Sequence, residues 1–219
     1  MLVYGKNVLY ETDKKNIKKV YVYRKEYIDY LKKEKIKYDI VDINKLNSLV
    51  DGNHQGIVLD VLDYEYYDFK KIDSDFVVIL DHLTDPHNFG AIIRSCACCG
   101  IKDIIIPSKR SVLVNDTVIK VSAGNIKHVN ISMVSNINNA INTLKNRGYF
   151  VYSADMYGTN YKNVDYATKK CLVIGSEGDG VSRLVKENSD VLVSINIMDD
   201  TESLNASVAA GILMFEMRN

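Results

Sequence analysis

Three segments of this sequence place polar residues and glycines directly after strongly apolar runs. Residues 81–94 contain Asn88 and Arg94, residues 175–180 read Gly-Ser-Glu-Gly-Asp-Gly, and residues 195–207 contain Ser203 and Asn205. In an open parallel sheet, ligands bind beyond the carboxyl ends of the strands. These three segments are therefore the candidates for chemistry.

The first candidate segment offers an amide and a guanidinium. Asp85-Pro86 predicts a turn, and Asn88 is an expected N-cap of the helix that follows. Arg94 falls among the apolar residues of that helix. It could pair with a carboxylate or reach the surface along its aliphatic stem. It could also contact a phosphate or hydroxyl near the strand ends, and the residues alone favour the structural role.

The second segment is a glycine loop. Its glycines allow a ligand to approach the backbone closely and allow positive φ angles. The structural alternative is a tight turn between a strand and a helix. The spacing is not G-x-G-x-x-G and the loop lacks the lysine of a P-loop, so the usual nucleotide-phosphate sites are disfavoured.

The third segment leads into a helix of small residues, 206–211. Ser203 or Asn205 could cap that helix, and its small side chains allow close packing against another backbone, including that of a partner chain. Cys96, Cys98 and Cys99 lie in an expected helix without a second pair at zinc spacing, so they predict buried small residues and no metal site.

A basic cluster near the N-terminus is a candidate RNA contact. Most such clusters are solvated faces, but neighbouring tyrosines could stack on bases. The cluster comprises Lys14, Lys15, Lys18, Lys19, Tyr21 and Tyr23. The histidines are scattered and form no Ser-His-Asp pattern.

The elements that must position these residues follow from the apolar pattern. From residue 76 onward, strands alternate with helices, which predicts a mostly parallel sheet with helices on both faces. The expected strands are 76–80, 104–106, 129–134, 149–154, 171–174 and 191–195, and the expected helices are 88–99, 137–146, 181–188 and 204–217. The first part predicts a small α/β unit with strands at 20–23, 38–41 and 57–61 and a helix at 26–34.

Charge and composition divide the chain and limit its class. Residues 1–37 hold eleven Lys and Arg against five Asp and Glu, whereas residues 63–75 are acidic and rich in tyrosine. We therefore expect domains at 1–62 and 76–219, joined by a linker at 63–75. The 219 residues carry zero formal net charge, which excludes a strongly basic nucleic-acid binder. Without an export signal or an 18-residue apolar run, we expect a cytoplasmic protein with no membrane segment.

The three segments together resemble the SpoU (TrmH-like) branch of the SPOUT RNA methyltransferases. Residues 85–94 match the pattern D-P-x-N-x-G-x-I-x-R, residues 175–180 match G-S-E-G-x-G, and residues 203–209 match S-L-N-x-S-V-A. Residues 121–124 with His128 also look like the family. The resemblance implies methyl transfer from S-adenosylmethionine to a ribose 2′-hydroxyl of RNA.

The resemblance extends to the N-terminal part. Residues 5–8 and 54–57 look like the start and end of the RNA-binding domain of bacterial enzymes that methylate a guanosine ribose in large-subunit ribosomal RNA. The third motif departs from the family, because Asn196 and Asp199 stand where proline and glycine are usual. That departure concerns cofactor affinity more than the reaction class.

The resemblance also implies a trefoil knot in the C-terminal part, a homodimer and roles for individual residues. Catalytic roles fall to Arg94, Asn88, Glu177, Ser203 and Asn205, and cofactor contacts to Gly175, Ile195 and Leu204. Arg94 would activate the 2′-hydroxyl, either directly or through an adjacent phosphate. Two alternatives stay open: a transfer RNA substrate, and a non-catalytic RNA-binding or ribosome assembly factor.

Overall fold

The computed structural model describes residues 1–198 and 203–218, and its contacts divide the chain into two compact units. The first unit comprises Met1–Glu65 together with Val114–Gly124. The second comprises Tyr66–Leu113 and the chain from Asn125 onward.

The first unit is built on a four-stranded sheet of order β1-β4-β2-β3. Its strands are β1 (Leu2–Tyr4), β2 (Ile17–Val22), β3 (Tyr38–Ile40) and β4 (Ile57–Val61). Its helices are α1 (Lys6–Glu11), α2 (Ile28–Lys33), α3 (Ile43–Leu49) and α5 (Asp116–Val121). Alternating residues of β2 and β4, among them Val20, Val22 and Leu59, build a separate core.

The small α/β unit was predicted, but three of its helices and one strand were not. α1, α3 and β1 are each seven residues or fewer, too short to show a clear hydrophobic period. α5 lies more than fifty residues beyond β4 in the sequence, and only tertiary contacts assign it to this unit.

The second unit contains a six-stranded sheet of order β10-β8-β9-β5-β6-β7, in which every neighbouring pair is parallel. Its strands are β5 (Phe76–Asp81), β6 (Asp103–Pro107), β7 (Asn130–Val134), β8 (Phe150–Asn160), β9 (Lys170–Gly175) and β10 (Val191–Ser194). Its helices are α4 (Pro86–Cys99), α6 (Ile137–Asn146), α7 (Arg183–Glu187) and α8 (Ala206–Arg218). Short 3₁₀ turns cover Lys14–Asn16, Lys25–Tyr27, Phe69–Lys71, Asn125–His128 and Tyr161–Asn163.

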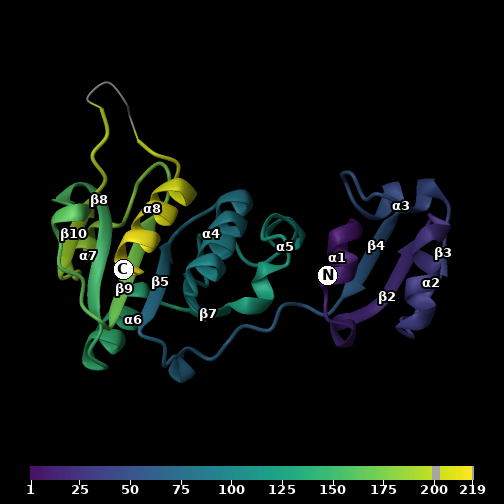
Figure 1. Cartoon of the computed structure of the whole chain (residues 1–219), viewed down its shortest axis with the longest axis horizontal. Coiled ribbons are helices and arrows are strands. Elements are labelled where there is room, and N and C mark those ends of the chain that lie inside the picture. The colour runs from purple at the N-terminus through teal and green to yellow at the C-terminus, as the bar shows by residue number, and fades with distance from the viewer. Residues whose placement is uncertain (199–202, 219) are drawn as a thin grey trace. The chain divides into compact units, whose positions relative to one another are not determined.

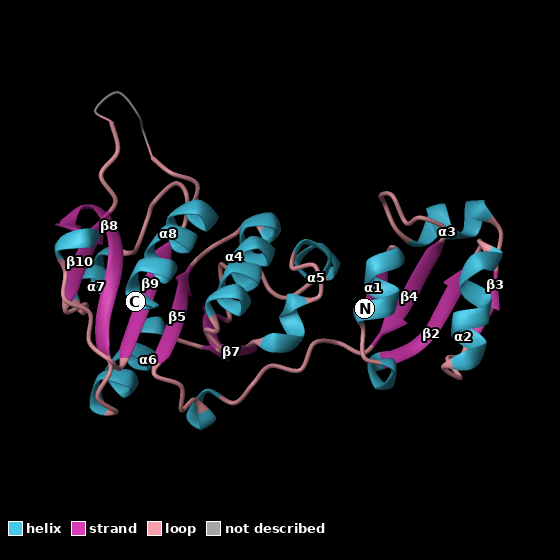
Figure 2. Cartoon of the chain, in the orientation of Figure 1, coloured by secondary structure: helices cyan, strands magenta, loops and turns pink. Residues whose placement is uncertain are grey.

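Helices cover both faces of this sheet (Figures 1 and 2). Val77 and Ile79 of β5 point into one core, which they share with Ile141 of α6 and Val185 of α7. α4 and α8 pack together, and the buried Cys96 thiol lies 3.4 Å from the Met214 sulfur. The predicted fold class, a parallel α/β sheet with a small N-terminal α/β unit, is confirmed.

The sheet order brings the three candidate segments to one edge. β10, β8, β9 and β5 are consecutive neighbours, and Asp81 at the end of β5 pairs in register with Gly175 at the end of β9. Because parallel strands share a carboxyl edge, the segments after β5, β9 and β10 all start at the same edge of the sheet.

Within the described residues, no helix is long and apolar enough to cross a membrane. Asp199, which stands where the family usually has glycine, lies outside the described residues. Asn196, which stands where proline is usual, is described and exposed.

Candidate active site

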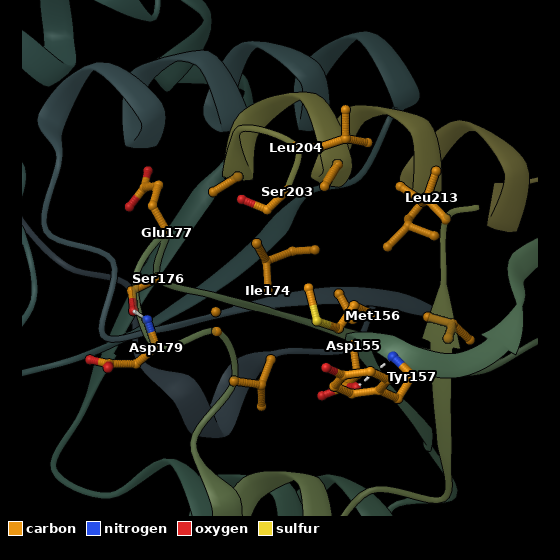
Figure 3. Close-up of a pocket in the computed structure, with 18 of the residues that line it drawn as sticks. Asp155, Met156, Tyr157, Ile174, Ser176, Glu177, Asp179, Ser203, Leu204 and Leu213 are labelled. Atoms are coloured by element: carbon orange, nitrogen blue, oxygen red, sulfur yellow. Dashed lines mark hydrogen bonds between the residues drawn. The ribbon is translucent and has the colours of Figure 1, made fainter. Parts of the chain in front are cut away.

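A cavity of about 580 Å³ lies at the carboxyl edge of the second unit's sheet. Its size is in the range of roughly 300–1,000 Å³ that is typical of small-molecule sites. Figure 3 shows Glu177 and Ser176 at one end, Met156 and Tyr157 at the other, and Ile174 between them. The wall therefore combines the end of β9, the glycine loop and residues 154–157 within β8.

The structure brings five of the eight predicted site residues to this cavity. They are Gly175, Glu177, Ile195, Ser203 and Leu204. These residues come from the second and third candidate segments. Ala206, Ala209 and Leu213 of α8 complete the same wall.

The glycine loop is closed on itself by backbone hydrogen bonds. The Ser176 N–H donates to the Gly180 carbonyl at 3.2 Å, and the Gly180 N–H donates to the Ser176 carbonyl at 3.0 Å. A Cβ at Gly175 would collide with the backbone of Gly180 and Val181. Gly180 has a φ of 65°, which favours glycine. The loop thus needs glycine at these two positions for its shape.

A buried carboxylate anchors the glycine loop to the neighbouring strand. Asp81, at the end of β5, accepts the Ser182 N–H at 2.7 Å, and its other oxygen lies 2.6 Å from His82 Nδ1. Asp81 is buried, and these two partners satisfy the hydrogen-bonding capacity of its carboxylate oxygens, as a buried polar group requires. The first segment therefore holds the second in place.

Asn88 links the two segments a second time. Its side-chain amide donates to the Glu177 carboxylate. The expectation that Asn88 caps its helix is wrong: Asp85 is the N-cap and accepts the His87 N–H at 2.9 Å. Pro86 at the first helical position moves the helix start two residues earlier, which frees the Asn88 side chain for Glu177.

Arg94 lies on α4 but does not line the cavity. Its side chain is exposed, and no described residue forms a hydrogen bond or ion pair with it. Pairing with a carboxylate, one of the two structural roles considered for Arg94, is therefore not seen, whereas its exposure agrees with the other, a side chain that reaches the surface. Its guanidinium is available to a ligand at the surface.

Asn205, not Ser203, caps the last helix. The Asn205 side-chain oxygen accepts the N–H groups of Ser207 at 2.9 Å and Val208 at 3.4 Å. Ser203 instead faces the cavity. Within the third motif, Asn205 thus caps the start of the helix, whereas Ser203 lines the cavity.

Two charged cavity residues were missed by the sequence reasoning. Asp155 and Lys186 line the cavity and form an ion pair of 2.5 Å. The sequence does indicate Asp155 as a site residue, because it directly follows the strand expected to end at residue 154. β8 continues instead to Asn160, with a register shift opposite Leu192 and Val193 that leaves residues 154–157 free to line the cavity.

No group of three potential ligands for a metal ion occurs among the described residues. Cys96 and Cys99 are buried as expected, whereas Cys98 is exposed on α4. Burial raises the pKa of the Cys96 thiol well above its ordinary value.

The basic cluster of the first unit is largely neutralised. Lys14, Lys15 and Lys19 lie 3.4, 3.3 and 2.5 Å from carboxylates of Glu34, Asp13 and Asp39, respectively. The hydrogen bond to Asp39 raises the pKa of Lys19. Three of the four lysines of the candidate RNA contact therefore lie beside carboxylates, whereas Lys18 forms no ion pair among the described residues.

Both parts of the chain are similar to known proteins. The model of the SpoU rRNA methylase family matches residues 75–215, and that of the RNA 2′-O ribose methyltransferase substrate-binding domain matches residues 2–67. YacO of Bacillus subtilis, assigned to the TrmH family of tRNA/rRNA methyltransferases, is 38% identical over 233 aligned positions that cover 98% of this chain and 94% of the relative.

Solved structures share the fold. The SpoU methyltransferase AviRb of Streptomyces viridochromogenes, in complex with S-adenosylmethionine, superposes with a TM-score of 0.86 at 20% identity over 100% of this chain and 89% of its own. An rRNA methyltransferase of Sinorhizobium meliloti with the same molecule bound gives 0.84 at 22% identity over 99% and 86%. The chain belongs to the SpoU family of RNA methyltransferases, as the three motifs predicted.

Proposed function

We propose that this chain transfers the methyl group of S-adenosylmethionine to a ribose 2′-hydroxyl of RNA. The observation that carries the proposal is the cavity at the carboxyl edge, where the glycine loop meets Ile195, Ser203 and Leu204. α4 contributes Asn88 to the same edge, through Glu177.

The residues of the cavity fit this cofactor. Its described wall carries three carboxylates, those of Asp155, Glu177 and Asp179, against the single ammonium of Lys186. That excess of negative charge suits a ligand with a positive sulfonium. The absence of a Cβ at Gly175 allows the loop beside the cavity to close. Gly175, Ile195 and Leu204 would hold the adenosine part.

When bound, the sulfonium supplies an electrophilic methyl group, so no metal is required for its activation. The chain must position the 2′-hydroxyl and provide a route for its proton. The transfer would join the methyl carbon to the 2′-oxygen as the sulfur–carbon bond breaks, with S-adenosylhomocysteine as the leaving group.

Arg94 serves this step by holding RNA. A guanidinium with a pKa above 12 is a poor base but binds phosphate in a bidentate manner. Arg94 binds the phosphate next to the reacting ribose, and an oxygen of that phosphate takes the hydroxyl proton. Its exposure and its lack of a described partner support this role.

The remaining predicted residues position these groups. Asn88 holds Glu177 at the cavity rim, Ser203 faces the cofactor or the ribose, and Asn205 sets the start of α8. Each would act on alignment and not on bond making.

The proposed substrate is a guanosine of large-subunit ribosomal RNA. Residues 1–62 would bind the RNA, residues 63–75 would link the domains, and residues 76–219 would catalyse transfer. The match of residues 2–67 to a substrate-binding model supports this division. We further propose that the chain is cytoplasmic and forms a homodimer. The exposed Val208 and Phe215 on α8 support the homodimer.

The test is transfer of tritium from labelled S-adenosylmethionine into unmodified large-subunit rRNA and, in parallel, bulk tRNA. We expect label in rRNA, with the methyl group recovered on a guanosine ribose. Label in tRNA alone would keep the reaction and replace the substrate. Cofactor binding without transfer to either RNA would identify a non-catalytic RNA-binding factor.

A further inference from the structure

The wall of the cavity carries an ion pair whose two residues belong to none of the three motifs. Lys186 Nζ is 2.5 Å from Asp155 Oδ2, and the Tyr157 N–H donates to Asp155 Oδ1 at 2.9 Å, as the dashed line in Figure 3 shows. The Asp155 side chain is 7% exposed and that of Lys186 33% exposed. The pair faces the cavity from β8 and α7.

Such a pair is a poor way to stabilise a fold. Removing two charges from water costs as much as their attraction returns, so apolar residues of similar size often serve equally well. Much of the surrounding wall is apolar, including Ile174, Val193 and Leu213. The placement of a carboxylate and an ammonium here is therefore better explained by a charged ligand.

The carboxylate is ionised at neutral pH. Burial acts to raise the pKa of Asp155, but the hydrogen bonds from Lys186 and from the Tyr157 N–H outweigh it, and the pKa lies below its ordinary value. The Asp155 carboxylate thus lies in its charged form on the cavity wall, beside the Lys186 side chain.

We propose that Asp155 and Lys186 recognise the amino-acid end of the methyl donor. The α-carboxylate binds the Lys186 ammonium, which has donors to spare beyond its bond to Asp155, and the α-ammonium binds Asp155, whose oxygens accept more than one bond each. The apolar side of the cavity, with Ile174 and Ile195, takes the adenine. The inference rests on the proposed function, because it assumes S-adenosylmethionine as the ligand.

The test uses ligands that differ only at the amino-acid end. S-adenosylhomocysteine carries that end, whereas 5′-methylthioadenosine retains the adenosine and thioether and lacks it. We expect the full-length wild-type protein to bind S-adenosylhomocysteine at least about 10-fold more tightly in calorimetric titration, a difference of about 1.4 kcal/mol. Decarboxylated S-adenosylmethionine is likewise expected to bind about 10-fold more weakly than the intact donor.

Variants assign this preference to the pair. Lys186→Met keeps the length of the side chain and removes its charge, and we expect it to lose about 10-fold in affinity for S-adenosylhomocysteine but less than twofold for 5′-methylthioadenosine. Lys186→Arg keeps the charge and is expected to keep the preference. Arg183→Met is the matched control, because Arg183 lies on the same helix but pairs with Glu187 at the surface.

Several outcomes overturn the inference. Equal affinity of the wild type for both ligands removes it, and so does an equal loss for both in Lys186→Met, which would make the pair a support of the cavity wall. The wild-type ligand series decides the question even if a variant does not fold. Binding of neither ligand by the wild type would remove the proposed function itself.

Discussion

At the scale of single residues, the site depends on side chains with different tasks and different surroundings. Gly175 shapes a loop, Asn88 connects two segments, and Arg94 stands exposed without a described partner. Substitutions at these positions should therefore separate folding, cofactor binding and catalysis from one another.

Arg94→Ala is expected to lower kcat by about 10²-fold or more, because the phosphate that takes the proton is no longer held. The affinity for S-adenosylhomocysteine and the Tm should not change, since no described residue depends on this side chain. Single-turnover methyl transfer, calorimetry and thermal unfolding measure the three quantities. Cys98→Ala, an exposed position on the same helix, is the control, and normal turnover by Arg94→Ala would remove Arg94 from the mechanism.

Gly175→Ala is expected to weaken S-adenosylhomocysteine binding by about 10-fold or more, because the new Cβ would force apart the closed loop. Gly178→Ala is the matched control within the same loop, since a Cβ there meets nothing within 4 Å. We expect it to bind within about threefold of wild type. Equal behaviour of the two variants in calorimetry would mean that loop closure is not what the cofactor needs.

At the scale of elements, the ends of helices and strands decide where polar groups are placed. Asp85 starts α4, Asn205 starts α8, and the register shift in β8 leaves residues 154–157 free to line the cavity. The basic cluster on and before β2 shows the reverse effect, because neighbouring elements supply carboxylates that neutralise it.

Asn205→Ala is expected to lower the free energy of unfolding by about 0.5–2 kcal/mol, the usual cost of losing an N-cap. The physical reason is that the N–H groups of Ser207 and Val208 lose their acceptor. Urea unfolding followed by circular dichroism gives the value. Ser203→Ala should leave it within about 0.5 kcal/mol, and an equal loss in both variants would show that the whole segment, not the cap, stabilises α8.

The combined substitution of Lys14, Lys15 and Lys19 by Ala is expected to change RNA affinity less than about threefold, because each lysine already lies beside a carboxylate. Replacing Lys6 and Lys25, exposed lysines of the same unit without a described ion pair, is expected to cost more, about 10-fold. Filter binding across a salt series measures both. A larger loss from the first set would place the RNA on β2 after all.

At the scale of the whole molecule, the two units carry separate cores, and the candidate active site belongs to the second. The side chains of Val208 and Phe215 on α8 are 49% and 52% exposed. An exposed apolar face on a helix beside the site suits the symmetric contact of a homodimer.

The double variant Val208→Asp and Phe215→Glu is expected to be monomeric, because carboxylates cannot be buried unpaired in a contact between copies. Size-exclusion chromatography with light scattering measures the mass of wild type and variant. Leu184→Glu is the control, since Leu184 is 58% exposed but lies on α7, outside the face of α8 proposed for the contact. A monomeric wild type would contradict the proposal directly.

Much of this architecture could be predicted from the sequence alone. The apolar runs at β5, β9 and β10 and the periodicity of α6 mark elements whose local pattern is strong, and the three motifs identify the family. Gly175, Ile195 and Leu204 were expected near the cofactor and do line one cavity. Local periodicity and motif spacing suffice where the determining contacts are close in sequence.

The tertiary structure decided what depends on distant partners. Asn88 donates a hydrogen bond to Glu177, which lies 89 positions later in the sequence. Asp155, at the register shift in β8, forms an ion pair with Lys186 of α7. α5 belongs to the unit that begins at residue 1. A local sequence pattern does not indicate such pairings, because they depend on the order of the strands in the sheet and on the course of the segment that follows each strand. The motifs themselves are written in the sequence, whereas the cavity that unites them exists only where β10, β8, β9 and β5 lie side by side.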